Sequence, residues 1–211
     1  MVWEIYKKSV VDFWEEMLYL VMFNFIWIVG SLLIIPGPFV TFALFFIAKD
    51  VGEGRGINFG KWWDYGRHNL KSAYIWGGIN FVALILFVSN IWTYGNIAAL
   101  WAAMAQLFFI SVLFFWLVLQ LIVLGLYPRL VEPSFKLAMR NAAILAGRYP
   151  MAIVATLAGI LLIAGISLFF VAPAILGGFA FVAVLTNSTV ELVVKKELDR
   201  LEEHQDQNQD K

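Results

Sequence analysis

Long uncharged stretches alternate with short charged ones along this chain, and the alternation predicts its main elements. Residues 17–48, 72–128 and 149–190 hold no charged side chain. A helix built from any of these stretches is apolar on every face, which is typical of membrane-spanning segments and not of water-soluble helices. A bilayer core about 30 Å thick takes about 20 helical residues. We therefore predict an all-α, polytopic helical membrane protein.

Prolines and turn residues divide each uncharged stretch into a pair of spans. Pro36-Gly37-Pro38 interrupts the first stretch, because proline lacks an N–H and fixes φ. Residues 92–96 (WTYGN) divide the second stretch, because they include turn residues and aromatic residues typical of a membrane interface. Pro173 interrupts the third stretch. We expect about six membrane helices in three hairpins, all in one transmembrane domain of residues 1–194. The predicted spans lie near 17–35, 38–51, 72–92, 99–126, 151–171 and 174–193.

The second span, 38–51, is short for a membrane helix. Its 14 residues form about 21 Å of helix, less than the bilayer core. Either it crosses fully with Lys49 extended to the surface, or it enters partway as a re-entrant arm shielded by protein. The competing arrangement is one continuous helix through Pro36-Gly37-Pro38, which gives five spans and an external N-terminus. It loses backbone hydrogen bonds in hydrocarbon, so we disfavour it.

Three segments outside the spans carry an amphipathic helical pattern. Residues 1–16 place apolar side chains in one stripe among charges. Asn58 is positioned to cap a helix with an aromatic face, and Ser134 to begin another that runs to about Gly147. We predict three interfacial helices, each preceding a pair of spans.

The basic residues indicate the orientation of the chain in a membrane. All of them fall in four segments: 1–16, 49–71, 129–148 and 195–211. The intervening turns carry none, so the positive-inside rule places both termini on the cytoplasmic side. The last segment is predicted to be a charged cytoplasmic tail, disordered from Gln205 onward. The 15 basic and 15 acidic residues cancel, so no basic surface indicates binding to nucleic acid.

Near the last span, Glu191 and Lys195 have the spacing of a favourable ion pair on one helix face.

The first 80 residues resemble a known family. The run Asn24-Phe25-Ile26-Trp27, the Pro36-Gly37-Pro38 bend and the arm ending in Ala48-Lys49-Asp50 resemble the N-terminal signature of the YesL-like family. These are small bacterial integral membrane proteins that carry a domain of unknown function. Gly56-Ile57-Asn58-Phe59 and residues 62–69 resemble the family's next stretch. The resemblance implies a multi-pass protein of the bacterial plasma membrane. It also implies an accessory or regulatory role in carbohydrate uptake.

The spans offer little to support catalysis. The chain has no cysteine and only two histidines, and no protease or hydrolase motif occurs in it. We therefore expect no enzyme activity: no catalytic residue, no bound cofactor and no metal site. The spans hold no ionisable residue away from their ends, where Glu191 lies at the cytoplasmic end of the last span. This also argues against a proton-coupled carrier.

Four amides are the main polar groups of the spans: Asn24, Asn80, Gln106 and Gln120. They either form interhelical hydrogen bonds or line a polar cavity. Asn24 and Asn80 each lie about eight residues into a span, so we expect the two to meet across a helix contact. The cavity interpretation supports an alternative function, a small oligomeric permease or channel for a neutral solute.

Four basic residues beside the spans are candidates for docking to lipid headgroups or to a partner: Lys61, Arg67, Arg140 and Arg148. The expected partners are the lipid bilayer, membrane transporter subunits and a second copy of this chain.

Overall fold

The structure is a computed structural model that describes the backbone of residues 1–209 and the side chains of residues 1–203. The described chain is all-helical, with no strand, as the sequence predicts. Three pairs of apolar helices are each preceded by an amphipathic helix. The helices are α1 Val2–Glu15, α2 Met17–Leu32, α3 Gly37–Gly52, α4 Phe59–His68, α5 Leu70–Gly95, α6 Leu100–Leu126, α7 Phe135–Arg148, α8 Pro150–Phe169, α9 Val171–Pro173 and α10 Phe179–Gln209, with short η1 Tyr127–Arg129 and η2 Ala174–Gly178.

Four of these segments are each long and apolar enough to cross a membrane: Leu70–Gly95, Leu100–Arg129, Pro150–Phe169 and Val171–Glu203. Helices α1 and α2 meet at 90° and add a fifth if they are counted as one broken span. Several long apolar helices are therefore present, as a helical membrane protein requires.

Helix α3 occupies the centre of the fold. It packs against α2, α4, α5 and α10. Its Phe42, Leu44, Phe45 and Ile47 are almost completely buried. Lys49 near its end pairs with Glu53 at 3.6 Å. The short arm is thus surrounded by protein along its length, as the re-entrant alternative requires.

The chain reverses direction at the Pro36-Gly37-Pro38 bend. Helix α2 ends at Leu32, and Ile34 adopts the left-handed region with φ of 62°. Helix α3 then packs back along α2 so closely that a Cβ added at Gly30 would lie 2.8 Å from Cγ1 of Val40. A single continuous helix through this stretch is therefore wrong.

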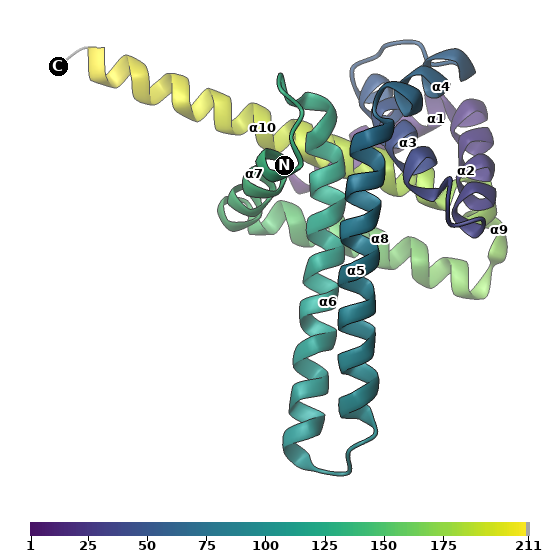
Figure 1. The fold of residues 1–211 in the computed structure, drawn as a ribbon. Helices are drawn as coiled ribbons and strands as arrows, with labels where there is room; N and C mark the ends of the chain where they lie inside the picture. The colour runs from purple at the N-terminus through teal and green to yellow at the C-terminus, as the bar shows by residue number, and fades with distance from the viewer. Residues whose placement is uncertain (210–211) are drawn as a thin grey trace.

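Helices α5 and α6 form a long hairpin that extends away from the other helices (Figure 1). Helices α8 and α10 run across this hairpin instead of alongside it (Figure 1). The three pairs of apolar helices therefore point in different directions.

The turn predicted at Pro173 is a break between α8 and α10. After α9, the chain makes a π turn, and Gly177 has φ of 156°. Beyond this break, α10 continues to Gln209 as one helix. Residues 205–209, where the sequence predicts disorder, continue this helix. Residues 210–211 lie outside the described part.

The three amphipathic segments form helices α1, α4 and α7 as predicted. Asn58 caps α4, since its Oδ1 accepts a hydrogen bond from the backbone N of Lys61 at 2.9 Å. Ser134 precedes α7 without a capping hydrogen bond from its side chain.

Candidate functional site

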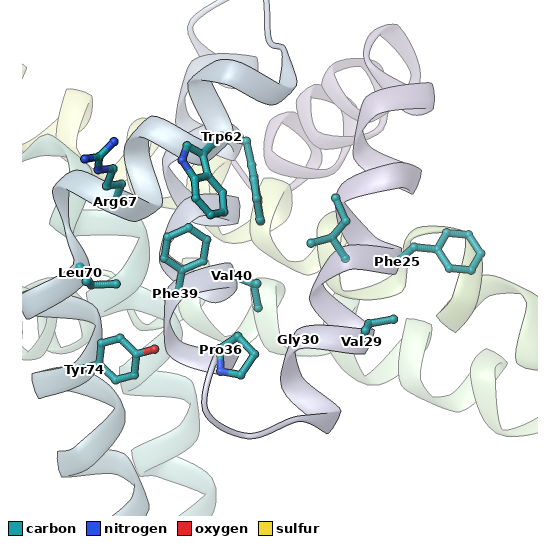
Figure 2. A pocket seen from close by; sticks show the side chains of 12 residues that line it. Phe25, Val29, Gly30, Pro36, Phe39, Val40, Trp62, Arg67, Leu70 and Tyr74 are labelled. Carbon is teal, nitrogen blue, oxygen red and sulfur yellow. The ribbon is translucent and has the colours of Figure 1, made fainter.

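A groove of about 710 Å³ opens on the flank of the protein between α2, α3, α4 and α5 (Figure 2). Its lining is apolar except for Arg67, the hydroxyl of Tyr74 and the indole N–H groups of Trp62 and Trp63. We define the groove by six of its residues: Phe25, Val29, Phe39, Trp62, Arg67 and Tyr74. A concave apolar site with a few polar groups is the usual form of a ligand site in proteins.

Two glycines allow the walls of the groove to pack closely. A Cβ added at Gly66 would lie 2.4 Å from Cζ of Phe39, so this ring rests on the backbone of α4. Phe39 in turn meets Trp62 edge to face, with ring centroids 5.6 Å apart. Gly30 gives α2 the same close approach to Val40 of α3. The groove is therefore shaped by contacts within the protein.

Arg67 belongs to α4 and lines the groove at the end that this helix forms. Its side chain is exposed. Among the described residues it has no ion-pair partner within 4.0 Å. Lys61, another predicted docking residue, differs: its Nζ donates to the carbonyl of Gly56 at 2.6 Å and lies 3.7 Å from Asp50. Of these two cations on α4, Arg67 is the one free to meet an external anion.

The remaining two predicted docking residues lie on α7. Arg148 forms an ion pair with Glu197 of α10. The same carboxylate accepts a hydrogen bond from the Tyr149 hydroxyl at 2.9 Å. Arg140 is exposed and has no ion-pair partner in the described part of the chain.

Three polar side chains surround the buried carboxylate of Asp50, near the end of α3. Tyr65 donates its hydroxyl to Oδ2 of Asp50 at 2.7 Å, while Arg55 and Lys61 lie 3.6 and 3.7 Å from the carboxylate. Burial, together with the hydrogen bond to Asp50, raises the pKa of Tyr65 to about 12. This cluster ties α4 to the end of α3.

Two of the four predicted amides lie together between α5 and α6. Asn80 donates to Oε1 of Gln120 at 3.3 Å, and both side chains are buried. Two indoles complete the cluster: Trp76 donates to Gln120 at 2.9 Å, and Trp116 donates to Asn80 at 3.0 Å. The polar groups of the two amides therefore meet partners within the protein.

Asn24 lies elsewhere, so the expected contact between Asn24 and Asn80 is wrong. Its Nδ2 donates to the carbonyls of Ala174 and Ile175, both at 2.9 Å. Its Oδ1 accepts from the backbone N atoms of Phe179 and Ala180 at 3.0 and 3.1 Å. The break before α10 leaves backbone groups unpaired, and these are the partners of this amide.

Gln106 bonds near the tip of the hairpin, where its Nε2 donates to the carbonyl of Ile91 at 3.3 Å. All four amides thus form hydrogen bonds to another helix or helix end, and none of them lines the groove.

A charged network between α1, η1 and α10 was not predicted from the sequence. Glu191 lies 3.7 Å from Lys8 and 3.8 Å from Arg129, and Lys8 lies 3.1 Å from Asp12. Arg129 also donates to Oδ1 of Asn187 at 2.5 Å. The signal in the sequence was the position of Arg129 and Glu191, each the first charge after a long uncharged stretch.

The expected pairing of Glu191 with Lys195 does not form, because Glu191 meets cations from other helices instead.

Comparison of the chain with protein-family models, with curated proteins and with solved structures found no significant match. The resemblance to the YesL-like family therefore rests on the sequence motifs.

Proposed function

We propose that this is a multi-pass protein of the bacterial plasma membrane and an accessory or regulatory component of carbohydrate uptake. In this role it contacts the membrane-spanning subunits of a transporter. The supporting observation is the α5–α6 hairpin, which extends beyond the rest of the bundle (Figure 1). Of the 26 residues of α5, only Ala73 and Asn80 are buried.

The surface of the hairpin is suited to contact with other membrane helices. Phe81 and Ile85 of α5 and Phe108 and Phe115 of α6 are all exposed. Helices in a bilayer associate through van der Waals packing, since lipid tails are as apolar as the side chains. A projecting hairpin offers two faces for such packing without opening the bundle.

The alternative function is a small oligomeric permease or channel for a neutral solute. Gln106 favours it, because this partly exposed amide lies near the tip of the hairpin, where several copies of the chain would bring their amides together. Asn24, Asn80 and Gln120 support the accessory role instead, since their hydrogen bonds to the protein leave them no free polar group to line a path.

We further propose that six helices enter the membrane and that both termini are cytoplasmic. The charged segments between the helix pairs would then face the cytoplasm. Such a topology would place the tip of the α5–α6 hairpin on the outer side.

Site-specific photo-crosslinking in cells tests the accessory role. A photoreactive amino acid at Phe108 should crosslink to a transporter subunit, whereas one at the exposed Leu162 of α8 is the matched control. Deletion of the gene should slow uptake of the corresponding sugar. Flux of a neutral sugar into liposomes that contain only the purified protein would instead establish the permease.

A further inference from the structure

The groove between α2, α3, α4 and α5 has an apolar interior and a cationic rim (Figure 2). We propose that it binds an anionic phospholipid, with one acyl chain along Phe25, Val29 and Phe39 and the phosphate beside Arg67. This inference requires only that the protein lies in a membrane, and it is independent of the partner of the hairpin.

The position of Arg67 in the chain fits the headgroup region. Lys71 is the last charged residue before 57 uncharged ones, and Arg67 lies four residues before it. Trp62 and Trp63 lie in the preceding turn, and tryptophan is enriched at membrane–water interfaces. On the other side of Arg67, the groove continues to Tyr74 of α5, which already belongs to the uncharged run. The rim of the groove therefore lies at headgroup depth, and its interior lies on the hydrocarbon side.

The charges around the rim favour an anionic lipid over a neutral one. Arg67 and Lys71 are both exposed, and in the described part of the chain neither lies within 4.0 Å of a carboxylate. The one acidic residue of α4 is Asp64, and the neighbouring cation Lys61 is already paired with Asp50. Exposed basic residues at the membrane surface attract anionic headgroups.

The indole of Trp62 provides a further polar group at the same end of the groove. Its Nε1 is buried and has no hydrogen-bond acceptor among the described residues. A buried donor without a partner is costly. The ester carbonyls of a phospholipid lie between its phosphate and its acyl chains, and they are acceptors that an apolar partner helix does not offer.

Native mass spectrometry of the protein in a neutral detergent tests this proposal. The probes are dioleoyl phosphatidylglycerol, dioleoyl phosphatidylcholine and the short-chain dihexanoyl phosphatidylglycerol. We expect the first to bind most tightly. Arg67→Gln should weaken its binding about fivefold, the effect of one cation near a membrane surface, whereas Arg67→Lys should restore most of it. Lys136→Gln removes an exposed cation from α7 that has no proposed role in binding, and it should change nothing.

A second variant tests the apolar part of the site. Val29→Trp places a large side chain in the groove and should weaken binding of both dioleoyl lipids, with Val29→Phe as the milder version if the first does not fold. Equal binding of the two dioleoyl lipids by the wild type would overturn the proposal. So would equal binding of the short-chain and long-chain phosphatidylglycerols, or unchanged binding by Arg67→Gln or by a folded Val29 variant. These measurements use the purified chain alone, so their failure would leave the proposed transporter contact untouched.

Discussion

Asn24 caps the start of α10 at Phe179, 155 residues later in the chain. Its Oδ1 accepts the backbone N–H groups of Phe179 and Ala180, and its Nδ2 donates to two carbonyls of the preceding π turn. One side chain on α2 thus satisfies backbone groups on both sides of the break between α8 and α10. A side chain from another helix does here what an N-cap residue does locally.

Replacement of Asn24 should therefore destabilise the protein more than replacement of an asparagine that bonds only within its own helix. Asn24→Leu removes four hydrogen bonds, and at about 0.6 kcal/mol each the expected loss is about 2 kcal/mol. Thermal unfolding in detergent measures the effect. Asn90→Leu is the control, because that amide bonds the Leu86 carbonyl of its own helix. Similar losses for the two variants would contradict the capping role.

The network around Arg129 gives a second prediction. Arg129→Gln leaves Glu191 with Lys8 as its cationic partner and should cost about 3 kcal/mol, because a partly buried carboxylate loses a charge partner. The double variant with Glu191→Gln should cost less than the sum of the single variants. A double-mutant cycle from unfolding in detergent measures this coupling, and strictly additive losses would show that the pair contributes nothing.

The hydrogen bond between Tyr65 and Asp50 predicts a pH dependence. The pKa of Tyr65 is raised to about 12, above the ordinary value of about 10, so the fold favours the neutral phenol. This contribution to stability is complete below about pH 10 and is lost as the pH rises through about 12. The tyrosinate absorbance of the wild type minus that of Tyr65→Phe should show this late titration. Asp50→Asn should shift it to lower pH.

The contact between Gly66 and Phe39 can be tested with a single methyl group. Gly66→Ala brings a Cβ within 2.4 Å of the Phe39 ring, so the ring must move, at a cost of about 1–3 kcal/mol. Gly78→Ala is the matched control, because a Cβ at that helical glycine meets nothing within 4 Å. Helix propensity alone should leave the control neutral or slightly stabilised. Equal unfolding temperatures for the two variants would mean that the Phe39 ring can move away from α4 without a cost in stability, which would contradict the prediction.

Single-cysteine labelling tests the proposed topology in a chain that has no cysteine of its own. Ile35→Cys and Asn96→Cys lie in exposed turns and should react with an impermeant reagent in intact cells. Val2→Cys and Lys136→Cys are exposed as well and should react only after the cells are permeabilised. Reaction of Val2→Cys in intact cells would exclude a cytoplasmic N-terminus.

Most helix boundaries could be predicted closely, because charge and proline mark them; the exception is the predicted span 174–193, which corresponds to α10, Phe179–Gln209. The predicted span 99–126 coincides with α6, Leu100–Leu126, and the short arm 38–51 with α3, Gly37–Gly52. Hydropathy changes sharply at these boundaries, and proline cannot continue a helix. Local signals of this kind need no knowledge of the tertiary structure.

The partners of the polar residues could not be predicted in the same way. Asn24 was expected to meet another amide, but backbone groups freed by a π turn at Gly177 are its partners. Hydropathy does not encode such a turn. The groove also depends on how four helices are placed relative to one another. The sequence features most closely linked to the groove are Gly30 and Gly66, where a side chain would collide with α3.

The contacts of the first helices also constrain the order of events during synthesis. Tyr6 and Asn24 bond to Ala155 and Ala174, about 150 residues later in the chain. At 5–20 residues per second, a ribosome needs roughly 8–30 s to make that length. During this time the amide of Asn24 lacks its final partners, because they have not yet been synthesised. The N-terminal third is therefore translated first but can complete its native hydrogen bonds only when the last two apolar helices arrive.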